Sequence, residues 1–242
     1  MKHKYILRHG FSFTNEYWKN LIPLLEGEVV FYDPYLRRPG EELCPTKDPC
    51  VVRVSSSLGS FASLKDDVKG ERFAPRDEGR VVGIGHSLGF QELNNSGIEF
   101  DFLVCLQGFI DYCGSEPKQR ERRAREIDGM IKAFEIDTKK RIQEFHDYCN
   151  CDDPLPQSIV AEDLIADLLS MKKSYEYCGR PALAIGSDAD DIVPMSIIND
   201  NFQRFAPLVK IEQINGVPHS LGFLKAKEVA EKIKEFEESL DA

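Results

Sequence analysis

Residues 81–89 read VVGIGHSLG, and they decide the expected architecture of the chain. An apolar run leads into the G-x-S-x-G pattern from Gly85 to Gly89, and the helix-compatible residues 89–94 follow it. A strand that turns sharply into a helix holds the residue at the turn in a strained conformation, and flanking glycines allow close backbone packing. The pattern therefore predicts that Ser87 projects from the end of a central strand as a nucleophile. The alternative is an ordinary glycine-rich turn.

A serine hydroxyl is a weak nucleophile until a base takes its proton, so the site needs a histidine in a loop near a strand end. His219 meets this need, because residues 216–220 (GVPHS) come directly after a predicted strand and before the last predicted helix. Three other histidines fit less well: His3 is near the terminus, His86 adjoins the serine, and His146 falls in a charged helical region. His219 is the predicted general base.

The base needs a carboxylate that fixes its tautomer and stabilises its charged form. Residues 186–194 (GSDADDIVP) follow the penultimate predicted strand and offer three acids, Asp188, Asp190 and Asp191. From the residues alone, each of the three is a candidate.

Acyl transfer also needs N–H donors aimed at the developing oxyanion. The first expected donor is the backbone N–H of Leu88, the residue after the serine. The second is expected from residues 9–12 (HGFS), after the predicted strand 4–7, through the N–H of Phe11. The chain order of oxyanion loop, serine, acid and histidine agrees with a serine on a strand-to-helix turn.

Short apolar segments alternate with helical ones along the chain, which predicts an α/β fold with a mostly parallel sheet flanked by helices. Residues 114–177 are charged and helical and lie between two predicted strands. We expect them to form a helical cap inserted into a core of residues 1–113 and 178–242. Residues 34–77 are assigned no element apart from a strand at 51–54. The predicted strands are residues 4–7, 28–32, 80–84, 100–106, 182–185 and 209–214, and the predicted helices outside the cap are residues 15–25, 89–94 and 223–240.

The chain resembles the α/β-hydrolase superfamily over nearly its whole length. The resemblance rests on residues 9–11 with Trp18, on residues 85–89, on residues 190–194 and on residues 216–219. It implies a hydrolase core with a catalytic triad and no cofactor or metal.

Within that resemblance, the acid of the triad is Asp190. It stands four residues before Pro194, as in the D-x-[ILV]-V-P pattern common in these hydrolases. The loop is one residue longer than usual, so Asp188 and Asp191 remain alternatives. Asp111 is a further alternative, because some members of the superfamily place the acid after the strand that precedes the cap.

A closer resemblance is to the pimeloyl-ACP methyl ester esterases of biotin synthesis. Residues 9–18 (HGFSFTNEYW) are similar to the oxyanion segment of that group, including the spacing to the tryptophan, and residues 134–137 and 145–149 are similar to its cap helices. This resemblance implies an ester linked to an acyl carrier protein as the substrate.

A basic run at the start of the cap bears on that partner. Residues 118–125 (KQRERRAR) contain five cations in eight residues, whereas the whole chain has a net charge of −10. A cationic patch could steer an acidic carrier protein to the pocket mouth. The plain alternative is a solvated helix face. The candidate partner-binding residues are Arg120, Arg122, Arg123 and Arg125.

The composition limits the other classes of function. Hydrophobic residues make up 42% and charged residues 30% of the 242 residues, as in a globular protein that folds alone. The acidic balance argues against nucleic acid as a partner. No apolar run approaches the roughly 20 residues that span a bilayer, and the N-terminal run is too short for a signal-peptide core, so we expect a cytoplasmic protein.

The seven cysteines form no regular framework, so we expect free thiols rather than disulfides. Cys149 and Cys151, with Asp152 and Asp153 beside them, lack the second cluster that a zinc site needs. We therefore expect no metal and no cofactor.

Together these inferences predict a serine hydrolase that cleaves a carboxylic ester through an acyl-enzyme. The same triad would serve a thioesterase or a small peptidase, which remain alternatives. A non-catalytic hydrolase-like binding protein is the alternative from another class, although such proteins usually lack a member of the triad.

Overall fold

A computed structural model describes residues 3–32, 51–54, 79–155 and 161–241 of the chain. Its centre is a sheet of seven strands in the order β3-β2-β1-β4-β5-β6-β7. Six strands run parallel, and the edge strand β3 runs antiparallel to β2. This architecture confirms the predicted α/β class. The strands are β1 (His3–Arg8), β2 (Gly27–Tyr32), β3 (Val51–Val54), β4 (Val81–His86), β5 (Phe102–Leu106), β6 (Ala182–Gly186) and β7 (Val209–Gln213).

The sheet is buried on both faces, which explains why its strands are continuous apolar runs rather than alternating ones. Neighbouring side chains of one strand point to opposite faces: Tyr5 and Leu7 belong to one hydrophobic cluster and Ile6 to the other. β4 lies between β1 and β5, and its parallel neighbours are in register from residue 81 to residue 86. The serine motif therefore begins at the carboxyl end of a central strand.

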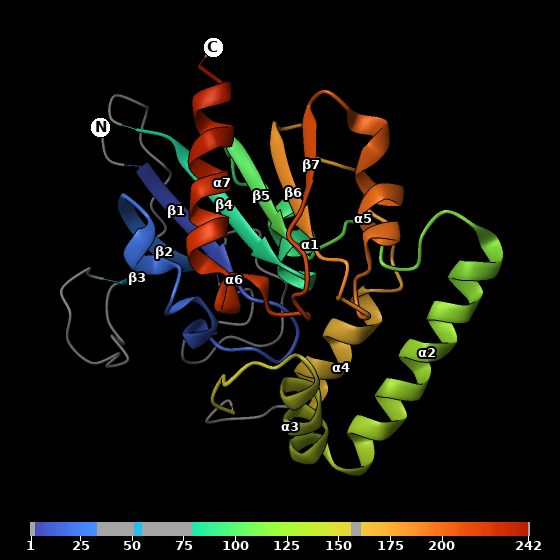
Figure 1. Cartoon of the computed structure of the whole chain (residues 1–242). Coiled ribbons are helices and arrows are strands. Elements are labelled where there is room, and N and C mark those ends of the chain that lie inside the picture. The colour runs from blue at the N-terminus through green and yellow to red at the C-terminus, as the bar shows by residue number, and fades with distance from the viewer. Residues whose placement is uncertain (1–2, 33–50, 55–78, 156–160, 242) are drawn as a thin grey trace.

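Helices cover the two faces of the sheet (Figure 1). On one face α7 (Ala226–Ser239) packs through Val229, Ile233 and Phe236, and the Phe236 ring lies 5.7 Å from that of Phe102. On the other face are α1 (Leu88–Asn94) and α5 (Met195–Phe202), whose aromatic rings at Phe90 and Phe202 are 5.5 Å apart. Shorter elements on the core are the 3-10 helices η1 (Asn15–Trp18), η2 (Ile22–Leu24) and η3 (Gln203–Phe205) and the single-turn helix α6 (Leu221–Leu224).

Three helices lie between β5 and β6, within the predicted insertion at residues 114–177. They are α2 (Pro117–Ile136), α3 (Thr138–Tyr148) and α4 (Ala161–Ser170). Figure 1 shows them gathered at the end of the sheet toward which the parallel strands point. The sites of α/β proteins lie at this edge, so these helices are placed to cover one. Within the described ranges, no helix is both long and apolar enough to cross a bilayer.

Two predicted helices differ in the structure. Residues 15–25 form η1 and η2 rather than one α-helix, because Pro23 lies at the start of η2 and cannot donate to a preceding turn. The N-cap of η1 is Thr14, whose side chain accepts a hydrogen bond from the N–H of Glu16. The predicted helix at 223–240 is divided at Lys225 into α6 and α7. The unassigned residues 34–77 lie outside the described chain, apart from the predicted strand at 51–54, which is β3.

A glycine on α1 should be essential to this packing. A Cβ added at Gly89 would lie 2.4 Å from the carbonyl oxygens of both Arg8 and His9. Because those atoms are backbone, Gly89→Ala must push α1 away from β1, and we expect it to lower the free energy of unfolding by about 3 kcal/mol. Chemical denaturation of the variant and the wild type measures the change.

The matched control is Gly129→Ala in the middle of α2. Apart from its own stretch of helix, a Cβ there would meet no described atom within 4 Å. Alanine is the better helix former, so the control should be neutral or stabilise by about 1 kcal/mol. Equal effects of the two substitutions would contradict the role assigned to the glycine on α1.

Candidate active site

Ser87 lies on the turn between β4 and α1 with backbone angles φ 54° and ψ −126°. A non-glycine residue adopts a positive φ of this kind only when its surroundings enforce it, and such residues gather at functional sites. Here the enforcing contact is close packing, since a Cβ at Gly85 would lie 2.4 Å from Cα of Phe90. The N–H of Ser87 donates to the carbonyl of Leu106 at the end of β5 (3.0 Å), which ties the turn to the neighbouring strand.

His219 and Asp190 meet at the same edge of the sheet. Nδ1 of His219 and Oδ2 of Asp190 are 2.8 Å apart, and the two residues are only 2% and 1% exposed. The other oxygen of Asp190 accepts the N–H groups of Ile192 and Val193, both at 2.9 Å. A carboxylate held in this way can only accept a hydrogen bond from the ring, so the neutral imidazole of His219 carries its proton on Nδ1. Nε2 of His219, which has no hydrogen-bond partner in the described structure, is then left with a free lone pair.

The three alternative acids have other partners. Asp188 accepts the N–H of Gly216 (2.7 Å), and Asp191 accepts the hydroxyl of Tyr148 (3.2 Å). Asp111 forms an ion pair with Arg120. Among these four carboxylates, only Asp190 is hydrogen-bonded to His219.

The expected oxyanion loop lies directly against the serine. A Cβ at Gly10 would approach Cβ of Ser87 to 2.8 Å, so this position admits only a glycine. The predicted donors are the backbone N–H groups of Phe11 and Leu88. Among the described hydrogen bonds none uses either group, which leaves both available to a ligand. Two donors beside the serine are what an oxyanion requires.

The two other histidines next to the serine are held neutral. Burial lowers the pKa of His9 to about 3, with the charge of Arg8 acting in the same direction. Burial also lowers the pKa of His86 well below its usual value, and the positive form of His219 would lower it further. The His86 ring stacks on Tyr17 with centroids 4.3 Å apart and lies 4.7 Å from the ring of His219. His86 therefore lies against the ring of His219 as a neutral imidazole.

The end of α3 is attached to the oxyanion loop by buried polar contacts. Nε2 of His146 lies 3.1 Å from the carbonyl oxygen of Ser12, and Nδ1 lies 3.2 Å from that of Asp153. The Asp153 carboxylate accepts both the N–H (2.6 Å) and the hydroxyl (2.9 Å) of Thr14. No sequence motif marks these contacts, so they could not be predicted from the residues.

The same segment also reaches the other two loops of the site. The hydroxyl of Ser220, the residue after His219, donates to the carbonyl of Cys149 at the end of α3 (2.6 Å). Phe145 presents its ring edge to the imidazole of His219, with centroids 6.5 Å apart. Ser87 itself is only 5% exposed.

The basic run on α2 is only partly available to a partner. Arg122 and Arg125 are exposed and pair with glutamates one turn away along the helix. Arg123, in contrast, is buried and donates to the carbonyl of Tyr112 (2.7 Å). The prediction that Arg123 binds a partner is therefore wrong, because its guanidinium is needed inside the cap. Arg120 is engaged with Asp111.

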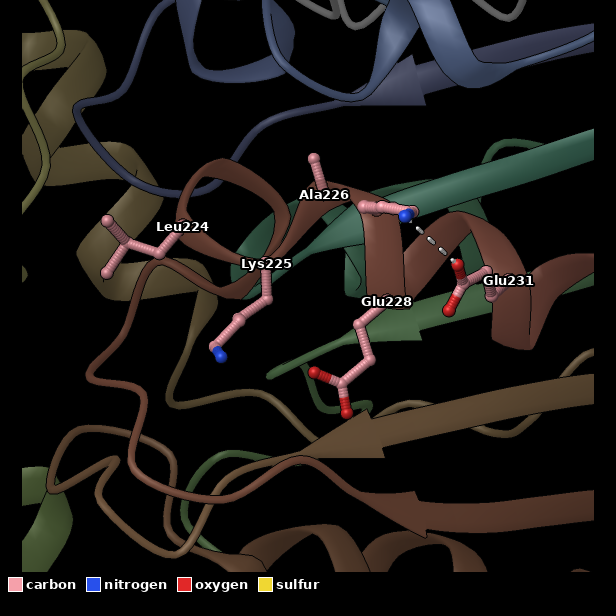
Figure 2. A pocket seen from close by; sticks show the side chains of 6 residues that line it. Leu224, Lys225, Ala226, Glu228 and Glu231 are labelled. Carbon is pink, nitrogen blue, oxygen red and sulfur yellow. Dashed lines mark ion pairs between the residues drawn. The ribbon is translucent and has the colours of Figure 1, made fainter.

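A surface hollow at the start of α7 is a separate feature (Figure 2). The Lys227–Glu231 ion pair (4.0 Å) lies at its edge, and none of its lining residues belongs to the triad. Among the described residues, no group of three histidine, cysteine, aspartate or glutamate side chains is placed to hold a metal ion.

The sheet order, the serine turn and the helical insertion together define the α/β-hydrolase fold, and the chain has this fold. Among solved structures, the chain is similar to an esterase from Exiguobacterium antarcticum (TM-score 0.64, 12% identity, covering 97% of this chain and 91% of that one). It is also similar to a lipase-esterase related protein from Clostridium acetobutylicum (TM-score 0.62, 13% identity, covering 97% of this chain and 94% of that one). A third similar structure is a bromoperoxidase from Bacillus anthracis (TM-score 0.61, 17% identity, covering 98% of this chain and 92% of that one).

No protein-family model matches the sequence of this chain, and no curated protein matches it significantly. The structural likeness confirms the fold that the superfamily resemblance implied. The closer resemblance to pimeloyl-ACP methyl ester esterases stays a prediction.

The carboxyl of Asp153 should make stability depend on pH. Burial raises its pKa to about 6, although the hydrogen bonds from Thr14 act in the opposite direction. The unfolded carboxyl titrates near pH ~4, so the stabilising contribution is present below that pH and is lost as the pH rises through 6. Asp153→Asn keeps hydrogen bonding to Thr14 without the charge. We expect the variant to gain stability relative to the wild type between pH 4 and 7, by about 3 kcal/mol at most.

Thermal unfolding of both proteins at pH 4, 5, 6 and 7 measures this difference. The difference in melting temperature between variant and wild type cancels the titration of groups that both proteins share. These include Glu16, which raises the pKa of Asp153, and Lys19, which lowers it. A difference in melting temperature that stays constant over this range would contradict the prediction.

Proposed function

We propose that the chain is a serine hydrolase that cleaves a carboxylic ester through an acyl-enzyme. The observation that carries the proposal is the buried hydrogen bond between Asp190 and His219, with Nε2 of His219 left free. Ser87 on its strained turn supports the same conclusion, as does the unused pair of N–H groups beside it.

In the proposed reaction, Oγ of Ser87 attacks the ester carbonyl carbon while its proton passes to Nε2 of His219. Asp190 stabilises the resulting imidazolium, and the N–H groups of Phe11 and Leu88 bind the oxyanion. Collapse of the tetrahedral intermediate releases the alcohol, which takes the proton from His219. A water molecule then gives a proton to His219 and attacks the acyl-enzyme, which frees the acid and restores the serine.

Ester cleavage is favoured by the names of similar solved structures, and a catalytic role is favoured over a binding role by the arrangement of the site. Solved structures similar to this chain include proteins named as esterases and lipases, although a fold alone does not fix a function. Among the alternatives, a thioesterase or a small peptidase would use the same three side chains. A non-catalytic binding protein would have no need of a buried pair of acid and histidine or of a strained serine turn.

The proposal predicts that Ser87→Ala abolishes esterase activity. Without the hydroxyl no acyl-enzyme forms, so kcat on p-nitrophenyl esters of graded acyl length should fall by about 10⁴-fold or more. A fluorophosphonate probe should label the wild type at this serine and leave the variant unlabelled. Activity assays and mass spectrometry of the labelled peptide measure both results.

Ser96→Ala is the matched control. Ser96 lies just beyond the other end of α1, and its hydroxyl donates to the carbonyl of Leu93 (2.7 Å). This variant should keep the wild-type kcat and probe labelling. Full activity of Ser87→Ala, or labelling of another residue in the wild type, would refute the proposed function.

An ester carried by an acidic acyl carrier protein is a second, narrower candidate for the substrate. It is favoured by the exposed positions of Arg122 and Arg125 on the helix that begins the cap. Their glutamate partners reduce the local positive charge, so the expected effect on association is modest. Exposed charges of this kind change the rate of encounter more than they change the strength of binding.

This candidate predicts that the double substitution Arg122→Glu with Arg125→Glu lowers kcat/KM on a carrier-bound methyl ester by about tenfold at low salt. Hydrolysis of p-nitrophenyl acetate should be unchanged. The control is Lys227→Glu with Lys234→Glu on α7, which changes the net charge equally and should affect neither substrate. Equal losses on both substrates would contradict the candidate.

A further inference from the structure

A buried glutamine at the end of β5 holds the backbone on both sides of His219. The side-chain Nε2 of Gln107 donates to the carbonyl of Pro218 (2.7 Å), and its Oε1 accepts the N–H of Leu221 (2.7 Å). Gln107 is fully buried. The amide of Gln107 therefore binds the backbone of Pro218, which precedes His219, and that of Leu221, which follows Ser220.

The same strand end is bonded to the other two parts of the triad. The carbonyl of Leu106 accepts the N–H of Ser87 (3.0 Å). The backbone N–H of Gln107 donates to the carbonyl of Ile185 (2.8 Å), on the strand that leads to Asp190. Two consecutive residues therefore connect the nucleophile, the strand before the acid and the loop of the base.

The backbone of Gln107 is itself in an unfavourable conformation. Its φ is 47°, in the left-handed region that is unfavourable for residues other than glycine. A glycine would relieve that strain but would provide no amide. The position thus combines backbone strain with a side chain whose amide nitrogen and oxygen are each hydrogen-bonded, and strain of this kind gathers at functional sites.

Other contacts hold neighbouring parts of the loop. Gly216 donates to Asp188, and Val217 donates to the hydroxyl of Ser187, so the loop is held before Pro218. The N–H of Ser220 also donates to the carbonyl of Pro218 (2.6 Å), and the Ser220 hydroxyl donates to the carbonyl of Cys149 at the end of α3. From the core of the sheet, the amide of Gln107 holds the loop on either side of the histidine.

We propose that Gln107 is a positioning residue that keeps the imidazole of His219 in place for reaction with Ser87. The inference rests on the proposed function, since it gives Gln107 a role in that reaction. Gln107 acts through the backbone of Pro218 and Leu221 and does not contact the substrate.

Gln107→Leu tests the proposal, because leucine fills a similar volume and removes both hydrogen bonds. A misplacement of the base by about 1 Å costs up to 100-fold, so we expect kcat on p-nitrophenyl acetate to fall about 10- to 100-fold, with KM within about twofold of the wild-type value. The matched control is Gln91→Leu. Gln91 is a buried glutamine on α1 whose amide donates to the carbonyl of Ile110 (3.1 Å), away from the His219 loop. Its kcat should stay within about twofold of the wild-type value.

A second measurement does not depend on activity. The proton that Nδ1 of His219 shares with Asp190 gives a far-downfield signal in the proton NMR spectrum. We expect the signal in the wild type and in Gln91→Leu, and we expect it to be broadened or lost in Gln107→Leu. Gln107→Glu keeps the acceptor for the N–H of Leu221 but places an oxygen against the carbonyl of Pro218, so it should weaken the NMR signal as well. This variant replaces Gln107→Leu in the test if the leucine variant does not fold.

The outcomes separate the two proposals. An unchanged signal and an unchanged kcat in folded Gln107 variants would overturn the positioning role, whatever the substrate. A lost signal in those variants, in a protein whose wild type shows no serine-dependent esterase activity, would support the positioning role and overturn the proposed function instead.

Discussion

The candidate site depends on how closely helix α1 approaches strands β1 and β4. At Gly85 and Gly89 even a methyl group would meet backbone atoms at 2.4 Å, so the helix rests on the strands with no side chain between them. That contact forces Ser87 into its strained turn and brings the N–H of Leu88 beside the hydroxyl. Gly10 extends the same close packing to the oxyanion loop. Replacing any of these glycines would move the backbone on which the serine depends.

Burial gives the site its electrostatic character. Asp190 and His219 are shielded from water, so the charge that His219 would acquire in the proposed reaction would be balanced by one nearby carboxylate in a medium of low dielectric constant. His9 and His86 stay neutral in the same surroundings, because burial lowers the pKa of each. Positive charge on either ring would oppose the imidazolium of His219.

The features that could be predicted from the sequence are those with a local pattern. Buried strands leave continuous apolar runs, and the turn at Ser87 leaves its flanking glycines, so the sheet and this strand-to-helix turn could be predicted from the sequence. Contacts between distant segments leave no such trace. The amide of Gln107 meets a carbonyl 111 residues away, and nothing in the residues around it indicates that partner. For the same reason the basic run could not reveal that Arg123 is buried, since Tyr112, which receives its hydrogen bond, precedes the run by several residues.

The end of α3 touches all three loops of the site, through His146 on the oxyanion loop, Tyr148 on the loop of the acid and Cys149 on the loop of the base. If a substrate enters the site past this segment, the contacts must break on its entry and break again when the product leaves. Friction with the solvent slows movements of a covering segment but hardly affects bond making at a buried serine. If these movements limit turnover, the rate follows the viscosity of the medium more closely than the reactivity of the leaving group.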